Sequence, residues 1–406
     1  MLLKEVATVK GGKRLPKSDA LVLEKTAHPY IRIRDMYQSY PLELNSDFEY
    51  ITQRTHEKIE KYIVKKGDII IAVVGNTIGL VSMIGESLDG ANLTENCNKI
   101  IDIHDYDSRF LYYFLVSKAG QDEIRKGIVG SSQPKLPIYN IEKFEIPDIP
   151  IKIQVCVAEI LENIDKKISN NENINKNLEQ QAKALFKSWF VDYEPFGGNQ
   201  PPEMYFVPLQ ELCKVVTKGT TPTTLGKSFT SLGINFIKAE SILDNHSIDS
   251  SKFTFIDEET NTVLKRSIIE ANDIVFTIAG TLGRFALVDD SILPANTNQA
   301  VAIIRPDTNK VSPSYLYSFF IGNWHNDYYS KRVQQAVQAN LSLTTIKSLP
   351  IAVTNKYTMS KYDELVRPLF TLMKSNEAEN RRLSDLRDAL LPKLMSGELD
   401  VSNIGL

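Results

Sequence analysis

Cysteine and histidine are scarce in this chain, which has three cysteines and five histidines among its 406 residues. Cys97, Cys156 and Cys213 lie far apart and lack the spacing of a zinc site or a disulfide framework. They indicate ordinary thiols in a reducing compartment, and hence a cytoplasmic protein. The histidines include no pair at i and i+4 and no zinc-protease signature. A metal centre is therefore not expected.

Long apolar runs and a one-sided charge are also missing. No stretch approaches the roughly 18 apolar residues of a membrane-spanning helix. The start, MLLKEVATVKGGKR, lacks the apolar core of a secretory signal. The formal net charge is −3, so binding to nucleic acid would require a local concentration of positive charge. Residues 1–17 provide one, because Glu5 is the single acid beside five basic residues: Lys4, Lys10, Lys13, Arg14 and Lys17.

Motifs for nucleotide binding and DNA methyl transfer are absent as well. Gly226-Lys227-Ser228 ends like a phosphate-binding loop, but Thr221 stands where the first glycine belongs. Residues 200–203 come nearest to the Asn/Asp-Pro-Pro-aromatic tetrad of DNA amino-methyltransferases, yet lack the first residue and the aromatic one. These four residues indicate a linker. We therefore expect a non-catalytic protein.

What the sequence does contain is an internal repeat at an offset of 205 residues. A helix-forming stretch from about Ile153 to Asp192 contains Asn175 and Leu178, which recur as Asn380 and Leu383 in a second such stretch. No gap interrupts the correspondence within these stretches. A repeat of this length indicates two copies of one structural unit.

The segments before the two helix-forming stretches repeat too. Residues 68–75 match residues 273–280 at the same offset, and each reads as a short buried strand followed by a glycine turn. Residues 315–320 echo residues 110–115, which are apolar and aromatic at helical spacing. The stretches between these anchors share almost nothing. We therefore expect a common framework that carries different loops.

The repeat predicts an α+β protein. Two similar globular domains would be separated by an antiparallel coiled coil of two long helices, related by a pseudo-two-fold axis. Each helix of about 40 residues would be roughly 60 Å long, and Pro368 would mark the start or a kink of the second one. The expected parts are a first domain (1–150), a first helix (151–195), a linker with the second domain (196–352), and a second helix with a C-terminal tail (353–406).

The apolar seam of each helix follows a seven-residue repeat that asparagines interrupt. Polar residues in such a seam lower stability but exclude wrong alignments; the alternative is that these asparagines lie beside the seam in solvent. The residues expected in helix–helix contact or partner docking are Ile164, Ile168, Asn171, Asn175, Leu178, Leu185, Trp189, Leu369, Met373, Asn376, Asn380, Leu383, Leu390 and Leu394.

Polar and basic loops occur at matching positions in both domains. Arginine and lysine can bind guanine edges, and asparagine and glutamine can bind adenine, whereas other side chains would hold phosphates. The alternative for any one of them is an ordinary solvated side chain. The candidate DNA-binding residues are Lys10, Lys13, Arg14, Lys17, Arg32, Arg34, Asn76, Thr77, Ser132, Gln133, Lys135, Lys218, Thr220, Thr221, Lys238, Thr281, Arg284, Gln338 and Asn340.

Distinctive motifs close the two helices. Residues 185–195 read LFKSWFVDYEP and residues 390–399 read LLPKLMSGEL, while the first domain contains GSSQPKL at 130–136. Together with the duplication, these motifs resemble the specificity (S) subunit of type I restriction–modification enzymes along essentially the whole chain. Residues 335–342, QAVQANLS, depart from the pattern of the first domain.

The resemblance implies two target recognition domains, each reading one half of a bipartite double-stranded DNA sequence. The helices would set the spacing and dock two methyltransferase (M) subunits, and motor-nuclease (R) subunits would join through the M subunits. S-adenosylmethionine, ATP and magnesium would be bound by these partners, which would flip and methylate an adenine in each half-site.

Two other readings remain open. One is a specificity subunit of an orphan methylation or phage-exclusion system, with a different set of partners. The other is a coiled-coil protein-interaction adaptor that does not bind DNA. A self-sufficient nuclease or methyltransferase has the least support, because the motifs for catalysis are missing.

Overall fold

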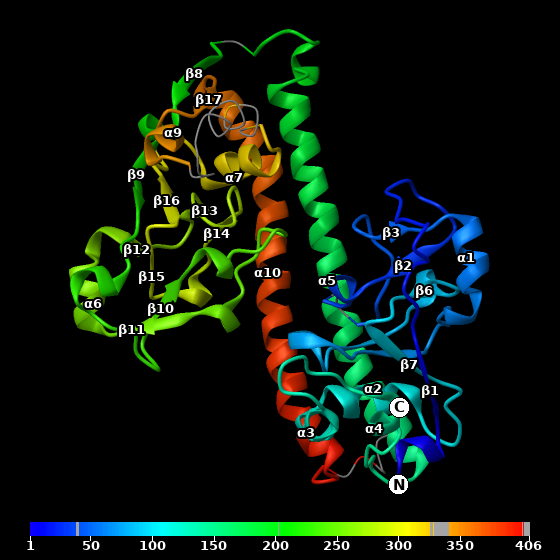
Figure 1. Ribbon diagram of the computed structural model, residues 1–406. Coiled ribbons are helices and arrows are strands. Elements are labelled where there is room, and N and C mark those ends of the chain that lie inside the picture. The colour runs from blue at the N-terminus through cyan, green and yellow to red at the C-terminus, as the bar shows by residue number, and fades with distance from the viewer. Residues whose placement is uncertain (38–39, 202, 325–327, 329–340, 400, 402–406) are drawn as a thin grey trace. The chain divides into compact units, whose positions relative to one another are not determined.

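The computed structural model describes residues 1–37, 40–201, 203–324, 328, 341–399 and 401. The chain divides into two compact units, of which unit 1 consists of Met1–Glu172 and Glu379–Leu406 and unit 2 consists of Asn173–Ala378. Two long helices, α5 (Ile151–Phe190) and α10 (Lys356–Met395), each contribute one segment to each unit (Figure 1).

Unit 1 has two sheets. The first has the order β1-β7-β4-β5 with all neighbours antiparallel, and the second has the order β3-β2-β6, in which β2 and β6 are parallel. The strands are β1 (Thr8–Gly11), β2 (Pro29–Ile31), β3 (Glu49–Tyr50), β4 (Ile69–Ala72), β5 (Val81–Met83), β6 (Asn92–Leu93) and β7 (Cys97–Ile101).

The helices of unit 1 cover its sheets and connect them. Its α-helices before α5 are α1 (Gln53–Ile59), α2 (Ser108–Val116), α3 (Lys118–Gly127) and α4 (Ile138–Ile141). Its described 3-10 turns are η1 (Leu3–Glu5), η2 (Ile33–Met36), η3 (Glu60–Tyr62), η4 (Gly75–Thr77) and η5 (Glu86–Leu88).

Strand β4 lies between two hydrophobic cores of unit 1. Ile69 and Ile71 belong to one core and Ile70 to the other, because successive side chains of a strand point to opposite faces. The first core extends to Leu161 on α5 and Leu394 on α10. Segments of both long helices therefore complete the core of unit 1.

Unit 2 repeats this plan with a fourth strand in its second sheet and with one further strand pair. Its sheets have the orders β14-β13-β16-β9 and β11-β10-β15-β12, and β17 pairs with β8 in a further two-stranded sheet. The strands are β8 (Tyr205–Pro208), β9 (Cys213–Lys218), β10 (Ile234–Ile237), β11 (Thr254–Ile256), β12 (Ile268–Ile269), β13 (Ile274–Thr277), β14 (Phe285–Leu287), β15 (Ala295–Thr297), β16 (Val301–Pro306) and β17 (Pro350–Val353).

Short helices join the strands of unit 2, and its largest core includes Phe186 on α5 and Tyr362 on α10. Its described α-helices other than α5 and α10 are α6 (Glu258–Val263), α7 (Pro313–Ile321) and α9 (Leu343–Lys347). Its described 3-10 turns are η6 (Glu194–Phe196), η7 (Leu209–Leu212), η8 (Pro222–Leu225), η9 (Ala239–Ser241), η10 (Ser250–Lys252), η11 (Lys265–Ser267) and η12 (Asp290–Ile292).

The predicted fold class is confirmed, since two β-rich domains accompany two long helices that pack together. Helix α10 differs from the expectation at its start. It begins at Lys356 and runs through Pro368, and the Asn355 side chain accepts a hydrogen bond from the Thr358 N–H at 3.0 Å. A side-chain cap and burial of its apolar face thus outweigh the hydrogen bond that the proline removes.

Asparagines connect the two helices within each unit. In unit 1, Asn171 donates to the Oδ1 of Asn380 at 2.8 Å, and in unit 2, Asn376 donates to the Oδ1 of Asn175 at 2.7 Å. Asn380 and Asn175 also donate to backbone carbonyls of the facing helix. Later residues of α5 bond to earlier residues of α10, so the segments are antiparallel.

The other expected seam residues are all buried or half-buried. The buried ones are Ile168, Leu178, Met373 and Leu394. The half-buried ones are Ile164, Leu185, Trp189, Leu369, Leu383 and Leu390.

Candidate nucleic-acid interface

The ends of several strands meet at one edge of unit 1. The end of β1 at Gly11 faces Asn98 near the start of β7, and the end of β4 at Ala72 faces Cys97. The parallel strands β2 and β6 end side by side at Ile31 and Leu93. The loops that follow β1, β2, β4 and β6 therefore leave the sheets at the same edge.

Backbone hydrogen bonds hold these loops together. The Val73 N–H donates to the Asn96 carbonyl at 2.9 Å, and the Gly75 N–H donates to the Pro134 carbonyl at 3.1 Å. The edge brings together residues 10–17, 75–77, 94–96 and 130–135.

Unit 2 has an equivalent edge. The Ile278 N–H donates to the Ala300 carbonyl at 2.8 Å, as Val73 does to Asn96 in unit 1. The Leu341 N–H donates to the Ile278 carbonyl at 2.9 Å, and this contact repeats one of Leu136 in unit 1. The loop that would precede Leu341 contains Gln338 and Asn340, which lie outside the described residues.

A close backbone approach at this edge requires glycine in both units. A Cβ atom on Gly12 would lie 1.9 Å from the Thr94 carbonyl oxygen, and one on Gly219 would lie 1.9 Å from that of Thr297. Both distances are far below a van der Waals contact. The two glycines thus let the chain that leaves β1 or β9 pass directly over the loop after β6 or β15.

The basic loop at the start of unit 1 is solvent-exposed. Arg14 forms an ion pair with Glu95, with 2.5 Å between Nε and Oε1, and this contact raises the pKa of Arg14. The Lys13 ammonium lies 5.5 Å from the centre of the Tyr62 ring, within reach of a cation–π contact. Lys10 and Lys17 are exposed.

The two other arginines of this edge are held by carboxylates. Glu49 forms ion pairs with both Arg32 and Arg34, and its Oε2 lies 3.1 Å from the Arg34 Nη2. Arg34 also approaches Asp35, at 3.4 Å. Such carboxylates reduce net positive charge, but they also restrict the guanidinium groups to defined orientations.

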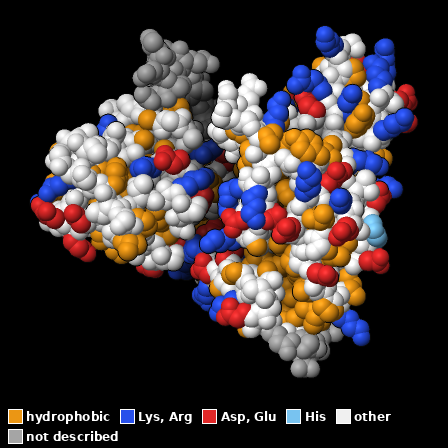
Figure 2. Space-filling view, turned by 60° about the horizontal axis from the view of Figure 1, so that its bottom comes forward, with side chains coloured by type: hydrophobic (Ala, Val, Ile, Leu, Met, Phe, Trp, Pro, Cys, Tyr) orange, Lys and Arg blue, Asp and Glu red, His pale blue; other side chains and the backbone are white. Residues whose placement is uncertain are grey.

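Unit 2 shows the same pairing of arginine with acid. The Arg284 guanidinium binds Asp244 and donates to the Ile242 carbonyl at 3.3 Å. Lys238 lies 4.9 Å from the centre of the Phe229 ring. Figure 2 shows lysine and arginine side chains beside acidic ones at several places on the face that it draws.

The remaining predicted residues divide between exposed and internally bonded side chains. Those that are exposed are Asn76, Ser132, Gln133, Lys135 and Lys218. Those that bond within their unit are Thr77 (to the Val74 carbonyl), Thr220 (from Arg266), Thr221 (to Gln299) and Thr281 (to the Ala239 carbonyl).

Sequence reasoning missed the acidic partners and the loop after β6. Asn92, three residues before Glu95, has an equivalent in Asn296 at an offset of 204 residues, so the repeat could have identified this loop. Glu49 and Asp244 had no such signal, because each meets its arginine only through the tertiary fold.

Two other kinds of site are not found in the part of the chain that the structure describes. It contains no group of three or more His, Cys, Asp or Glu side chains that could hold a metal ion. None of its helices is long and apolar enough to cross a membrane.

Comparison with known proteins places this geometry in a family. Residues 1–180 and 201–385 match the model of the type I restriction modification DNA specificity domain. The chain is 24% identical to the type I restriction enzyme MjaIX specificity subunit of Methanocaldococcus jannaschii, over 99% of this chain and 93% of that protein. It is 25% identical to the HindI specificity subunit of Haemophilus influenzae, over 84% of this chain and 88% of that one.

The fold has a solved counterpart. The crystal structure of a type I restriction–modification S subunit from M. genitalium aligns with a TM-score of 0.57 and 17% identity, over 97% of this chain and 95% of that one. At this level of identity, the likeness extends to the fold alone.

Proposed function

The chain belongs to the family of type I restriction–modification DNA specificity subunits, and from this premise we propose how its two units recognise DNA. As such a subunit it is the non-catalytic component that gives a type I complex its DNA specificity. The proposal concerns the residues that bind DNA, the partners and the spacing.

Each strand-end edge is proposed to bind one half of a bipartite target in double-stranded DNA. The observation that carries this proposal is that equivalent edges recur in both units while the loops on them differ. The framework, including Gly12 and Gly219, is common, whereas Arg14 and Glu95 of unit 1 have different counterparts in unit 2. Two unlike surfaces on one framework suit two unlike half-sites.

The candidate residues are proposed to divide into two classes. Exposed lysines such as Lys10, Lys17 and Lys135 would hold phosphates, because a flexible ammonium provides charge without a fixed direction. The carboxylate-bound guanidinium groups of Arg14, Arg32 and Arg284 would contact base edges, because their orientation is restricted before DNA binds.

The partners follow from the family. We propose that α5 and α10 hold the recognition domains (residues 1–150 and 196–352) apart and dock two M subunits, through which R subunits join. S-adenosylmethionine, ATP and magnesium would be bound by these partners. Contacts along helices of fixed length would then set the gap between the two half-sites.

The experiment that tests the function is a map of methylated adenines in cells with and without this gene, expressed together with its M subunit. Loss of one split motif, with two short half-sites at a fixed gap, is expected when the gene is deleted. If an active M subunit methylates the same motif without this chain, DNA specificity lies elsewhere.

The salt dependence of DNA binding separates recognition from an adaptor role. Each phosphate contact contributes a slope of about −0.9 in a plot of log affinity against log salt concentration. Replacing Lys10, Lys17 and Lys135 by alanine in the complex is expected to make that slope shallower by about 2 to 3. A complex that binds DNA without any dependence on salt would contradict the proposed interface.

A further inference from the structure

The contact between α5 and α10 in unit 1 contains a buried polar group that the equivalent contact in unit 2 lacks. Asp165 of α5 is 6% exposed. Its Oδ1 accepts a hydrogen bond from the Arg387 Nη1 of α10 at 2.8 Å, and its Oδ2 accepts one from the Tyr113 hydroxyl at 2.8 Å. A buried carboxylate of this kind depends on its partners, because the loss of its cation would leave a charge buried and uncompensated.

The equivalent positions of unit 2 are apolar or small. At the offset of 205 residues, Asp165 corresponds to Phe370, and Arg387 corresponds to Ala182. Phe370 and Ala182 are buried in one core, and the Phe370 ring packs edge-to-face on a tyrosine of α7 at 5.0 Å. The same helix contact is thus polar in one unit and apolar in the other.

A second ion pair is likewise present in unit 1 and absent from the equivalent positions of unit 2. The Lys167 Nζ of α5 lies 3.2 Å from the Glu379 Oε2 of α10, and Asn171 also donates to that oxygen at 2.8 Å. The repeat places Leu372 where Lys167 stands and Ile174 where Glu379 stands. Both charges are again replaced by aliphatic side chains.

The asparagine contacts do not distinguish the two halves of the chain. The bond from Asn171 to Asn380 in unit 1 becomes, under the repeat, the bond from Asn376 to Asn175 in unit 2. Two copies of α5, or two copies of α10, could form these asparagine bonds as well. The asparagines therefore define the register of the helices but leave the choice of partner open.

We propose that Asp165–Arg387 and Lys167–Glu379 make the helix pairing heterotypic, so that α5 selects α10 and rejects the α5 of a second copy of this chain. In a pair of two α5 helices, Asp165 would face Ala182 and lose its cation. In a pair of two α10 helices, Arg387 would face Phe370. The pair of two α5 helices would thus leave a buried carboxylate without a cation, and the pair of two α10 helices would leave the half-buried Arg387 with only Asp388 of its own helix as an ion partner.

This selection keeps two different domains on one pair of helices. Each unit is built from segments of both helices, so exchange between two copies of the chain would combine two like halves. Such an assembly would carry two copies of one DNA-binding edge. The pairing rule itself stands on the helix contacts, and only its consequence for DNA rests on the proposed function.

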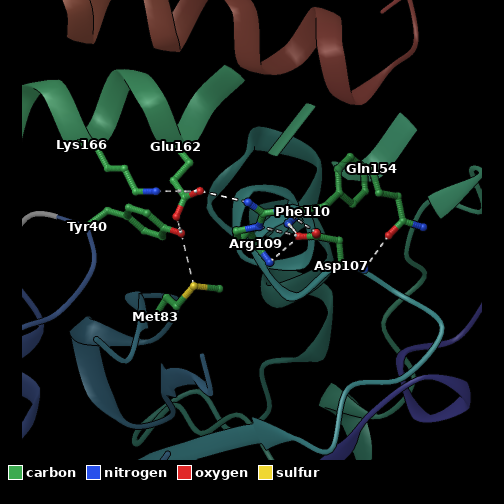
Figure 3. A network of polar contacts seen from close by, with 8 residues as sticks. All are labelled: Tyr40, Met83, Asp107, Arg109, Phe110, Gln154, Glu162 and Lys166. Atoms are coloured by element: carbon green, nitrogen blue, oxygen red, sulfur yellow. Dashed lines mark hydrogen bonds and ion pairs between the residues drawn. The ribbon is translucent and has the colours of Figure 1, made fainter. Parts of the chain in front are cut away.

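A further network bonds α5 to the first domain, so that α5 and this domain would exchange between copies as one piece (Figure 3). Glu162 of α5 accepts from the Arg109 Nη1 at 3.0 Å and from the Tyr40 hydroxyl at 3.3 Å, and Arg109 also binds Asp107. All four residues precede the linker between the two halves. Cutting that linker would leave the network intact.

The test starts from the folded full-length chain with a protease site inserted between Gly198 and Asn199, which lie in an exposed stretch. Cleavage yields fragments 1–198 and 199–406, which are allowed to exchange in mild denaturant and then to re-pair. Native mass spectrometry counts the pair of unlike fragments and the two pairs of like fragments. The unlike pair is expected to predominate.

The matched variant gives unit 1 an apolar contact like that of unit 2. It carries Asp165→Phe, Arg387→Ala, Lys167→Leu and Glu379→Ile, with Tyr113→Phe to remove the hydroxyl that would lose its acceptor. The preference for unlike pairs is expected to fall by about 100-fold or more, towards random pairing. Exchange of Lys167 with Glu379 alone, which inverts the pair but preserves it, should leave the preference unchanged.

If the substitutions of the buried Asp165 and its partner Arg387 prevent folding, the more exposed Lys167–Glu379 pair still provides a decisive test. Lys167→Leu with Glu379→Ile alone is expected to lower the preference for unlike pairs by about 2-fold to 5-fold. Like-fragment pairs from the unsubstituted chain in random proportion would overturn the proposal. So would an unchanged preference in a folded variant that lacks one or both of the ion pairs.

Discussion

At the scale of single residues, the absence of a side chain at Gly12 is what permits the close backbone approach at the edge of unit 1. Gly12 leaves room for the Thr94 carbonyl, whereas the adjacent Gly11 has its nearest neighbour, Asn98 Oδ1, at an ordinary 3.5 Å from an added Cβ. Gly12→Ala is expected to force β1 away from the loop after β6 and to destabilise unit 1 by about 1 to 3 kcal/mol.

Gly11→Ala is the matched control, since the same atom is added one residue earlier. Chemical denaturation measures the stability, and adenine mapping measures recognition of one half-site. Equal effects of the two substitutions would show that the close approach is not what requires glycine at position 12.

The Arg14–Glu95 pair suggests a separation of affinity from discrimination. Glu95→Gln removes a negative charge from the edge and releases the Arg14 guanidinium from its fixed orientation. The full complex is expected to bind non-target DNA more tightly and to discriminate less between target and non-target duplexes. Fluorescence anisotropy at two salt concentrations measures both; Glu86→Gln, at an exposed position away from Arg14, serves as the control. Unchanged discrimination would contradict a positioning role for Glu95.

His246 provides a pH dependence of unit 2. Burial lowers its pKa from 6.5 to about 4, although its contact with Phe285 and the charge of Asp244 oppose the shift. Because the folded state takes up the proton less readily than the unfolded state, stability is full above about pH 6.5 and falls as the pH decreases towards 4. The loss is expected to reach about 3 kcal/mol.

His246→Asn tests this dependence, because asparagine tolerates the positive φ of 63° at this position. Unfolding by urea at several pH values should show a shallower loss of stability in the variant. His104→Gln, at an exposed position, is the control. The same acid sensitivity in the His246 variant would assign it to other groups, such as Asp249, whose pKa is lowered in the folded state by its bonds to Ser251 and Lys252.

At the scale of the helices, the seam residues carry register. Asn376 is buried, and its amide donates to Asn175 at 2.7 Å. Asn376→Ala is expected to cost about 1 to 3 kcal/mol, because the Asn175 oxygen would be left without its donor. Urea unfolding measures the loss, with Asn173→Ala on the exposed face of α5 as control. An equal effect at both positions would contradict a role for the seam bond.

At the scale of the whole molecule, each compact unit joins parts from both ends of the sequence. The boundaries fall between Glu172 and Asn173 on α5 and between Ala378 and Glu379 on α10. Seven residues inserted at both boundaries would preserve the seam repeat and leave each unit intact. The insertion should lengthen the helices by about 10 Å and widen the gap between half-sites by about three base pairs. An unchanged gap in an active complex would contradict the proposed spacer.

The sequence alone contained the repeat, because an offset of 205 residues is visible without coordinates. The repeat predicted two similar α+β domains and two long helices, and the helix-end motifs indicated the family. Periodicity and turn residues suffice for such features, since they are local properties of the chain.

Only the tertiary structure decided which residues share a surface and which charges are neutralised. Arg32 meets Glu49, Arg284 meets Asp244, and Asp165 meets Arg387 across separations that no local pattern encodes. Ion pairs of this kind arise when separate elements pack, and the side chains at either end have many other possible partners. For the same reason, the difference between a polar and an apolar helix contact became visible only when both repeats were seen folded.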